Sequence, residues 1–170
     1  MWAQYGEGHK GVCLVFDRRR LVASLGDLAR EQNRQFFYGD VNYADIPSSI
    51  LRKGADPYSI DLDLAERLGV STFVRQHTVR YWRELYFLKH RDWQTENEYR
   101  VMLSNRDEDY VFVSILGSLV GVAFGEEFGF DASNKYAEEF ERNGIRGCLL
   151  HWKGHQPEPH PLMSSNGWVF

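Results

Sequence analysis

Apolar residues along the chain fall into short continuous runs and helical stripes, which predict its first strands and helix. Residues 11–16 form a continuous run rich in β-branched side chains, which is typical of a buried strand. Asp17 stands where a helix N-cap belongs, and leucines at helical spacing then predict a helix over residues 18–32. The aromatic-rich residues 36–43 predict a second strand.

Two further helices are predicted in the middle of the chain, after a loop rich in Pro, Gly and Ser. The first is short, with Ser59 or Asp61 as its cap, and it ends at Gly69. The second begins after Ser71. Its apolar stripe has a period of 3.6 residues, and we expect the helix to end near Lys89.

The second half of the chain returns to strand patterns. Residues 98–103 alternate between two faces, and residues 110–124 and 145–152 predict further strands. A charged helix is expected over residues 133–143. Because strands and helices follow one another without a regular βαβ order, the sequence predicts an α+β fold. We expect a mixed or mostly antiparallel sheet with three to four packed helices.

The length and composition describe a soluble globular protein. The chain has 170 residues, of which 43% are hydrophobic, so it can form a sizeable core. We expect one domain over residues 1–152, and an extended C-terminal tail over residues 153–170, which are rich in Pro and polar residues. No apolar run approaches the roughly 18–20 residues of a membrane helix, and no secretory signal is visible, so a cytoplasmic protein is expected.

The net charge bears on the class of binding partner, and the two cysteines bear on the redox state of the protein. The net charge of −4 does not favour nucleic acid as a partner. Cys13 and Cys148 each lie in an apolar run, so we expect two reduced thiols packed as small hydrophobic residues. A disulfide between them stays open, because their two strands could be neighbours.

The first candidate for chemistry is the acidic segment before the predicted strand at residues 98–103. If the strand begins by Glu96, then Glu96, Glu98 and Arg100 share one face, with about 6–7 Å between successive residues. Crowded carboxylates raise one carboxyl pKa, which suits acid–base catalysis, and Arg100 could hold an anionic group. The alternative is a solvent-facing strand with an Arg–Glu pair that contributes little to stability.

Histidines and arginines elsewhere give weaker candidates. His9 lies between glycines just before the first strand and could line a pocket, or it could lie in an ordinary surface turn. The run from Arg18 to Arg20 could bind phosphate, but positive charge at a helix start opposes the helix dipole. The histidines near the C-terminus lie among prolines and lack ligand spacing, so no metal site is expected.

Two motifs resemble the bacterial family called domain of unknown function 2971. They are the opening MWAQYGEGHKGVCLVFD and the later FLKHRDWQTENEYRVML. The first contributes Trp2, Tyr5, His9, Gly11, Cys13 and Phe16, and the second contributes Lys89, Trp93, Glu96, Glu98 and Arg100. Members of this family usually have a segment before the first motif, so the resemblance implies an N-terminally truncated domain.

The Glu-x-Glu pattern is more distantly similar to the acidic motif of ADP-ribosyltransferases. This similarity implies an NAD-dependent enzyme in which Glu98 contacts the nicotinamide ribose and stabilises the transition state. Glu96 would orient the acceptor, and His9 would complete the catalytic set. The similarity also implies a ligand-binding set made of Tyr5, Lys89, Trp93 and Arg100.

Two other functions stay open beside the enzyme. The same polar residues could recognise an anionic ligand, such as a nucleotide or a nucleic acid, without turnover, and binding would then be sensitive to salt. Alternatively, Trp93, Lys89, Glu96 and Arg100 could form a structural network that fixes the strand to the preceding helix.

Overall fold

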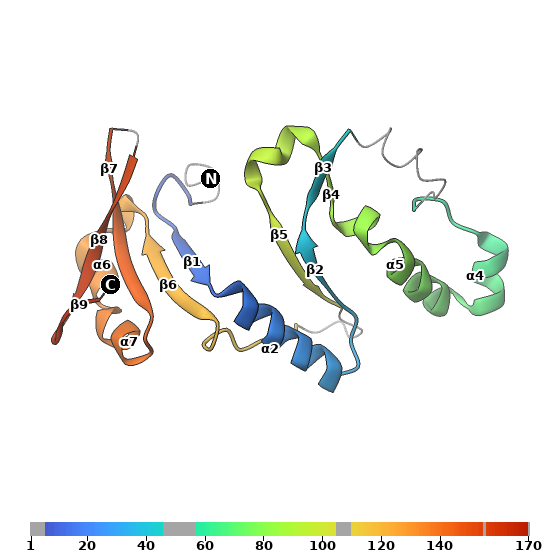
Figure 1. The fold of residues 1–170 in the computed structure, drawn as a ribbon, viewed down its shortest axis with the longest axis horizontal. Coiled ribbons are helices and arrows are strands. Elements are labelled where there is room, and N and C mark those ends of the chain that lie inside the picture. The colour runs from blue at the N-terminus through green and yellow to red at the C-terminus, as the bar shows by residue number, and fades with distance from the viewer. Residues whose placement is uncertain (1–5, 46–56, 105–109, 155, 170) are drawn as a thin grey trace. The chain divides into compact units, whose positions relative to one another are not determined.

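The chain divides into two compact units, each of which contains both helices and strands (Figure 1). The computed structural model describes residues 6–45, 57–104, 110–154 and 156–169. Unit 1 combines residues 1–30 with residues 107–170, and unit 2 spans residues 31–106. The predicted α+β class is therefore confirmed. The two units differ from the predicted arrangement of one domain to residue 152 followed by a tail.

Unit 1 is built on a mixed five-stranded sheet in the order β1-β6-β7-β8-β9. The strands are β1 (Val12–Phe16), β6 (Leu119–Phe124), β7 (Arg146–Lys153), β8 (Gln156–Ser164) and β9 (Gly167–Val169). Strands β6 and β7 are parallel, and the other neighbouring pairs are antiparallel. The predicted C-terminal tail supplies β8 and β9, so it is part of this sheet. Of the strand predicted over residues 110–124, only the β6 residues form a strand.

The core of unit 1 lies between the sheet and two short helices. Helix α2 (Arg18–Glu31) follows β1, with Asp17 accepting a hydrogen bond from the Arg20 amide at 3.1 Å, as the predicted cap requires. Helices α6 (Phe130–Asn134) and α7 (Ala137–Arg142) contact β7 and β8, and the 3₁₀ helix η2 (Glu126–Phe128) precedes them. The buried core comprises Val122, Phe124, Ala137, Ile145, Leu149 and Leu162.

The helix predicted over residues 133–143 is in fact two helices. The Ser133 hydroxyl donates a hydrogen bond to the Phe130 carbonyl at 2.9 Å, and the Asn134 side chain accepts one from the Met163 amide at 2.6 Å. Polar side chains that bind backbone groups in this way compete with the continuation of a helix. The break therefore follows from the Ser-Asn pair that ends α6.

Strand β8 has proline at every second position along its first half. Pro157, Pro159 and Pro161 lie opposite Trp152, Leu150 and Cys148 of β7. Residue pairs in an antiparallel ladder alternate between hydrogen-bonded and non-hydrogen-bonded pairs. Proline has no N–H, so it fits the non-hydrogen-bonded pairs, in which the N–H position points away from β7. The intervening residues of β8 can then supply the hydrogen bonds to β7, while the prolines face the other edge.

Unit 2 contains two small sheets and a helical pair. Strand β2 (Phe36–Asp40) pairs antiparallel with β5 (Tyr99–Leu103), and β3 (Asn42–Ala44) pairs parallel with β4 (Leu88–His90). Helix α4 (Leu62–Leu68) is capped by Asp61, one of the two residues expected as its cap, and it is followed by α5 (Val70–Tyr86). The 3₁₀ helix η1 (Arg91–Glu96) connects β4 to the residues before β5.

The end of α5 differs from its prediction near Lys89, because the chain turns at Phe87 into strand β4. Phe87 is buried and packs edge-on against Trp82, with ring centroids 4.8 Å apart. The Phe87 carbonyl accepts a hydrogen bond from the Asn42 amide at 2.8 Å. The apolar stripe predicted one more turn of helix. The chain instead buries the Phe87 ring and forms the strand pairing of β4.

The two cysteines are free thiols that lie on strands separated by β6. Cys13 pairs with Ala123, and Ala123 pairs with Cys148, so all three lie in one row across the sheet. Two strand spacings correspond to about 9.6 Å, whereas the Cα atoms of a disulfide lie about 4.4–6.8 Å apart. The sheet order therefore excludes the disulfide that the sequence left open. Burial, and to a lesser extent Cys13, raise the pKa of the Cys148 thiol.

We predict that the folded chain forms no Cys13–Cys148 disulfide under mild oxidation. Thiol titration of oxidised native protein should give two thiols per chain, with the exposed Cys13 reacting faster than the partly buried Cys148. Mass spectrometry of peptides from the native protein would detect a crosslink between the two residues. Such a crosslink would contradict the strand order.

Candidate functional site

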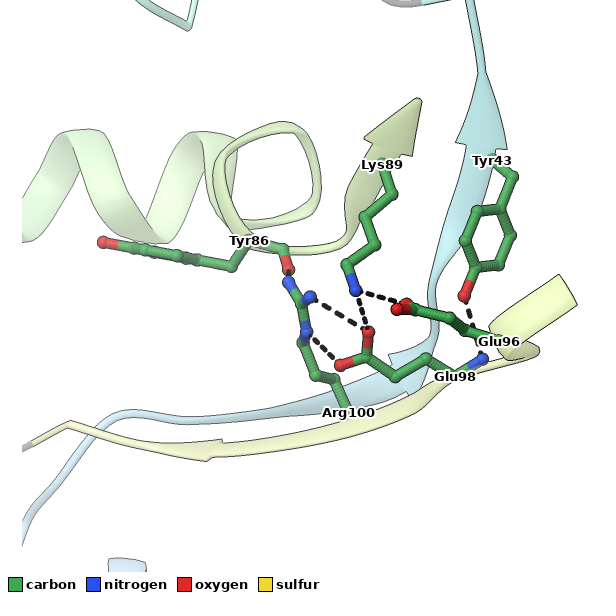
Figure 2. A network of polar contacts seen from close by, with 6 residues as sticks. All are labelled: Tyr43, Tyr86, Lys89, Glu96, Glu98 and Arg100. Carbon is green, nitrogen blue, oxygen red and sulfur yellow. Dashed lines mark hydrogen bonds and ion pairs between the residues drawn. The ribbon is translucent and has the colours of Figure 1, made fainter. Parts of the chain in front are cut away.

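Four of the predicted site residues meet in unit 2 and form what we call the ion-pair cluster. It consists of Lys89, Glu96, Glu98 and Arg100 (Figure 2). Their side chains are 16–28% exposed, so the cluster is largely shielded from solvent but not sealed. All four belong to the second sequence motif, although neither the predicted catalytic set nor the structural hypothesis contained the complete set.

The backbone brings the four residues together from three elements. Lys89 lies on β4, opposite Tyr43 of β3. Glu96 is the last residue of η1, and Asn97 then turns the chain with a left-handed φ of 46°. Strand β5 begins only at Tyr99. The prediction that Glu96 shares a strand face with Glu98 is therefore wrong, because a 3₁₀ turn rather than a strand holds Glu96.

Glu98 is the centre of the ion-pair cluster. Arg100 approaches its carboxylate with Nε 2.5 Å from Oε1 and Nη2 3.1 Å from Oε2. The Lys89 Nζ lies 2.8 Å from the same Oε2 and 2.5 Å from Glu96 Oε2. Arg100 also donates to the Tyr86 carbonyl at the end of α5. Figure 2 shows both cations pointing at the Glu98 carboxylate.

Hydrogen bonds hold the backbone of Glu98 as well as its side chain. The Glu98 N–H donates to the Tyr43 hydroxyl at 2.9 Å, and the Glu98 carbonyl accepts from the Val41 amide at 2.9 Å. These bonds attach the residue to the segment that contains β3. The cluster thus ties together β4, η1, the start of β5 and the end of α5.

The charges in the cluster fix its protonation. Hydrogen bonds from Arg100, and then from Lys89, lower the pKa of Glu98 and outweigh the opposing effect of burial. Hydrogen bonds to Glu96 and Glu98 raise the pKa of Lys89. The sequence suggested that crowded carboxylates raise a carboxyl pKa. At Glu98 the two cations reverse that effect.

This arrangement suits a structural ion-pair network better than a catalytic pair. Both Glu98 oxygens accept hydrogen bonds from cations, and a carboxylate with a lowered pKa is a weak proton acceptor. The two acidic and two basic side chains also have a net formal charge of zero. The cluster therefore attracts an anionic ligand only weakly.

The remaining predicted site residues lie elsewhere. Trp93 is in η1 with 49% of its surface exposed. Tyr5 lies outside the described residues, as does Trp2 of the same motif. His9 belongs to unit 1, whereas the ion-pair cluster belongs to unit 2, so the structure does not assemble the predicted catalytic set of His9, Glu96 and Glu98 within one unit.

The His9 turn is held closely against the segment after β6. Its ring Nδ1 lies 3.0 Å from Trp152 Nε1, and its carbonyl accepts a hydrogen bond from the Glu127 amide at 3.0 Å. His9 has a left-handed φ of 72°. A Cβ on residue 125 would lie 2.1 Å from the His9 carbonyl oxygen, so only glycine fits at Gly125. The indole can donate only to an unprotonated Nδ1, which orients the imidazole.

Metal ligation finds no support in the described part of the chain. His151 lies 3.3 Å from Glu126 and packs edge-on against His160, with ring centroids 4.5 Å apart. Among the described residues, however, no three His, Cys, Asp or Glu side chains gather closely enough to hold a metal ion.

A second candidate site in unit 2 was not predicted from the sequence. A pocket of about 420 Å³, which we call the arginine pocket, lies between the start of β2 and α5. It is lined by Asn33, Arg34, Gln35, Arg75, Gln76, Val79 and Arg80. Arg75 and Arg80 lie on the predicted long helix, but their spacing there indicates only an exposed polar face. The contribution of residues 33–35 depends on tertiary structure.

We predict that Glu98→Gln lowers the free energy of unfolding by about 1–3 kcal/mol, because it weakens hydrogen bonds to two cations. Urea denaturation of the purified chain at pH 7 would measure the change. Glu66→Gln is the matched control, since Glu66 is an exposed residue of α4 outside the cluster. Equal stability of Glu98→Gln and wild type would refute the structural role.

The contribution of Glu98 should also depend on pH in a defined direction. Its folded pKa lies below the ordinary value of 4.5. The stabilisation is thus complete above pH 4.5 and is lost as the pH falls through the lower, folded-state pKa. We expect the difference in unfolding free energy between wild type and Glu98→Gln to be constant from pH 7 to pH 5. It should shrink in denaturation series below pH 4.5, and a difference that grows on acidification would contradict the lowered pKa.

The comparisons with known proteins agree with the two sequence motifs. A family model described as "Protein of unknown function (DUF2971)" matches residues 1–101, which include the first motif, the second motif up to Val101 and the whole ion-pair cluster. No curated protein and no solved structure matches the chain. No helix in the described residues is long and apolar enough to cross a membrane. Since the family model covers more than half of its length, the chain belongs to the DUF2971 family.

Proposed function

We propose that this protein binds a phosphate-bearing ligand in the arginine pocket of unit 2 and does not turn it over. The observation behind this proposal is the composition of the pocket lining. Three arginines and three carboxamide side chains surround about 420 Å³, and none of these lining residues is acidic. Guanidinium groups pair with phosphate through two parallel hydrogen bonds, and pockets of about 300–1,000 Å³ accommodate small molecules.

The three arginines differ in how they are held, and the differences favour binding. Arg34 donates to the Ser104 carbonyl at 3.2 Å and to Gln32 at 2.6 Å, so its guanidinium is positioned before a ligand arrives. Arg80 lies 5.1 Å from the centre of the Tyr81 ring. Within the described part of the chain, Arg75 makes no ion pair or side-chain hydrogen bond. Its donors are therefore available to an anion.

The ion-pair cluster has a supporting role in this proposal. It joins the end of α5 to β4 and β5, and α5 supplies Arg75 and Arg80 to the pocket. The cluster would therefore hold a wall of the pocket without touching the ligand. The carboxamides of Gln35 and Gln76 offer donors and acceptors for the rest of a nucleotide-like ligand.

The alternative is the NAD-dependent ADP-ribosyltransferase that the Glu-x-Glu pattern implies, and it stays a prediction. The contacts of Glu98 do not favour it. A carboxylate that two cations already neutralise gives weak electrostatic stabilisation to a developing positive charge on the ribose. Because NAD contains phosphates, both functions predict that NAD binds, and only turnover separates them.

Calorimetric titration with pyrophosphate, ADP and NAD would test the binding proposal. We expect binding that weakens as salt rises, and a loss of affinity of about tenfold or more in each of Arg75→Gln and Arg80→Gln. Arg67→Gln is the matched control, because it removes an exposed arginine of α4 that does not line the pocket. Equal affinities in all three variants, or no binding to any of the phosphates, would refute the proposed function.

A nicotinamide-release assay on the same proteins would separate binding from turnover. We expect no release above buffer from wild-type chain at saturating NAD. Release that Glu98→Gln abolishes, in protein that still unfolds cooperatively, would establish the transferase instead.

A further inference from the structure

A groove in unit 1 has a different character from the arginine pocket. It lies on the sheet and encloses about 700 Å³, within the range of small-molecule sites. The register places Val15, Gly121 and Arg146 in one row, and Ala123, Cys148 and Pro161 in the next. Residues paired across a sheet share a face, so these side chains all point to the same side.

This face is the opposite of the one that forms the core. Val122 and Leu149 alternate with the groove residues along β6 and β7, and they pack in the core cluster. Gly121 has no side chain and Ala123 has only a methyl group, so these two residues form the floor of the groove. Val15 is 46% exposed on one side, and Pro159 and Pro161 form the other side. The groove therefore exposes apolar surface in a concave form.

Arg146 gives the groove a single charge. Of the residues that line the groove, only Arg146 is charged. It is exposed, and within the described part of the chain it makes no ion pair or side-chain hydrogen bond. Its row partner Gly121 has no side chain to cover it. An apolar groove with one unpaired guanidinium is complementary to a molecule with an apolar body and one anionic head group.

We propose that the sheet groove of unit 1 binds a carboxylic acid with an apolar body, whose carboxylate pairs with Arg146 and whose body lies over Gly121 and Ala123. Guanidinium and carboxylate form two parallel hydrogen bonds in a planar pair. The body covers the partly buried thiol of Cys148, which lines the groove beside Ala123. This inference is independent of the arginine pocket, which belongs to unit 2.

The first test uses octanoate as the probe, with 1-octanol as its uncharged counterpart. Calorimetry on the full chain should show octanoate binding that Arg146→Gln weakens by about tenfold or more, with little change in octanol binding. Arg142→Gln is the matched control, because Arg142 is an exposed arginine of α7 outside the groove. If octanoate binds no better than octanol, or if both variants bind it equally, the proposal is wrong.

The second test locates the ligand through Cys148. In a Cys13→Ser background, octanoate should slow the alkylation of Cys148 by N-ethylmaleimide, and octanoate should lose this effect in Arg146→Gln. Ala123→Phe, which fills the floor, should abolish octanoate binding while thermal unfolding stays cooperative. Octanoate binding that leaves Cys148 alkylation unchanged would overturn the proposed location. Analytical sedimentation would show whether the chain forms a dimer. If wild type is a dimer and Ala123→Phe is a monomer, the groove binds a second copy of the chain and the proposed ligand is wrong.

Discussion

The Glu98 carboxylate between Arg100 and Lys89 is the centre of a network that connects β4, η1, β5 and the end of α5 in unit 2. The described residues of unit 2 form two-stranded sheets, and such small sheets contribute little stability of their own. The cluster compensates by joining four segments through one partly buried anion. Removing one partner would leave a partly desolvated charge without compensation, which costs more than the intact pair contributes. We expect a network of this kind to fix the geometry of the segments that it joins.

The sequence predicted most of the local structure, because local signals determined it. Strands β1 and β7 and the Asp17 cap lie where hydrophobic pattern and capping chemistry placed them, and Asp61 is the one of two expected residues that caps α4. The pattern was wrong about burial in β1, which is mostly exposed. The α+β class followed from the irregular order of the elements. Some errors lie at element ends, and others interrupt an expected element, as between α6 and α7. Helix α5 stops early because Phe87 is buried against Trp82, and a single sequence does not reveal that contact.

The sequence indicated that part of the candidate site lies together, but it did not indicate the geometry. The motif grouped Lys89 with Glu96, Glu98 and Arg100, yet it gave no sign that η1 rather than a strand holds Glu96. The lowered pKa of Glu98 depends first on the hydrogen bonds from Arg100, two residues later, and then on Lys89 of β4, nine residues earlier. The arginine pocket was missed for a similar reason. Arg34 and Arg75 are 41 residues apart, and only the packing of α5 near the start of β2 makes them neighbours.

The alternating prolines of β8 also determine how the molecule can associate. A strand edge with unused N–H and C=O groups is a template for another chain, and it commonly leads to intermolecular sheets. At residues 157, 159 and 161 this edge of β8 has proline, which has no N–H to donate to another strand. Strand β9 pairs only with Leu162–Ser164, where the prolines end. Newly made chains that expose this edge before folding is complete are therefore protected from the strand exchange that begins amyloid-like aggregation.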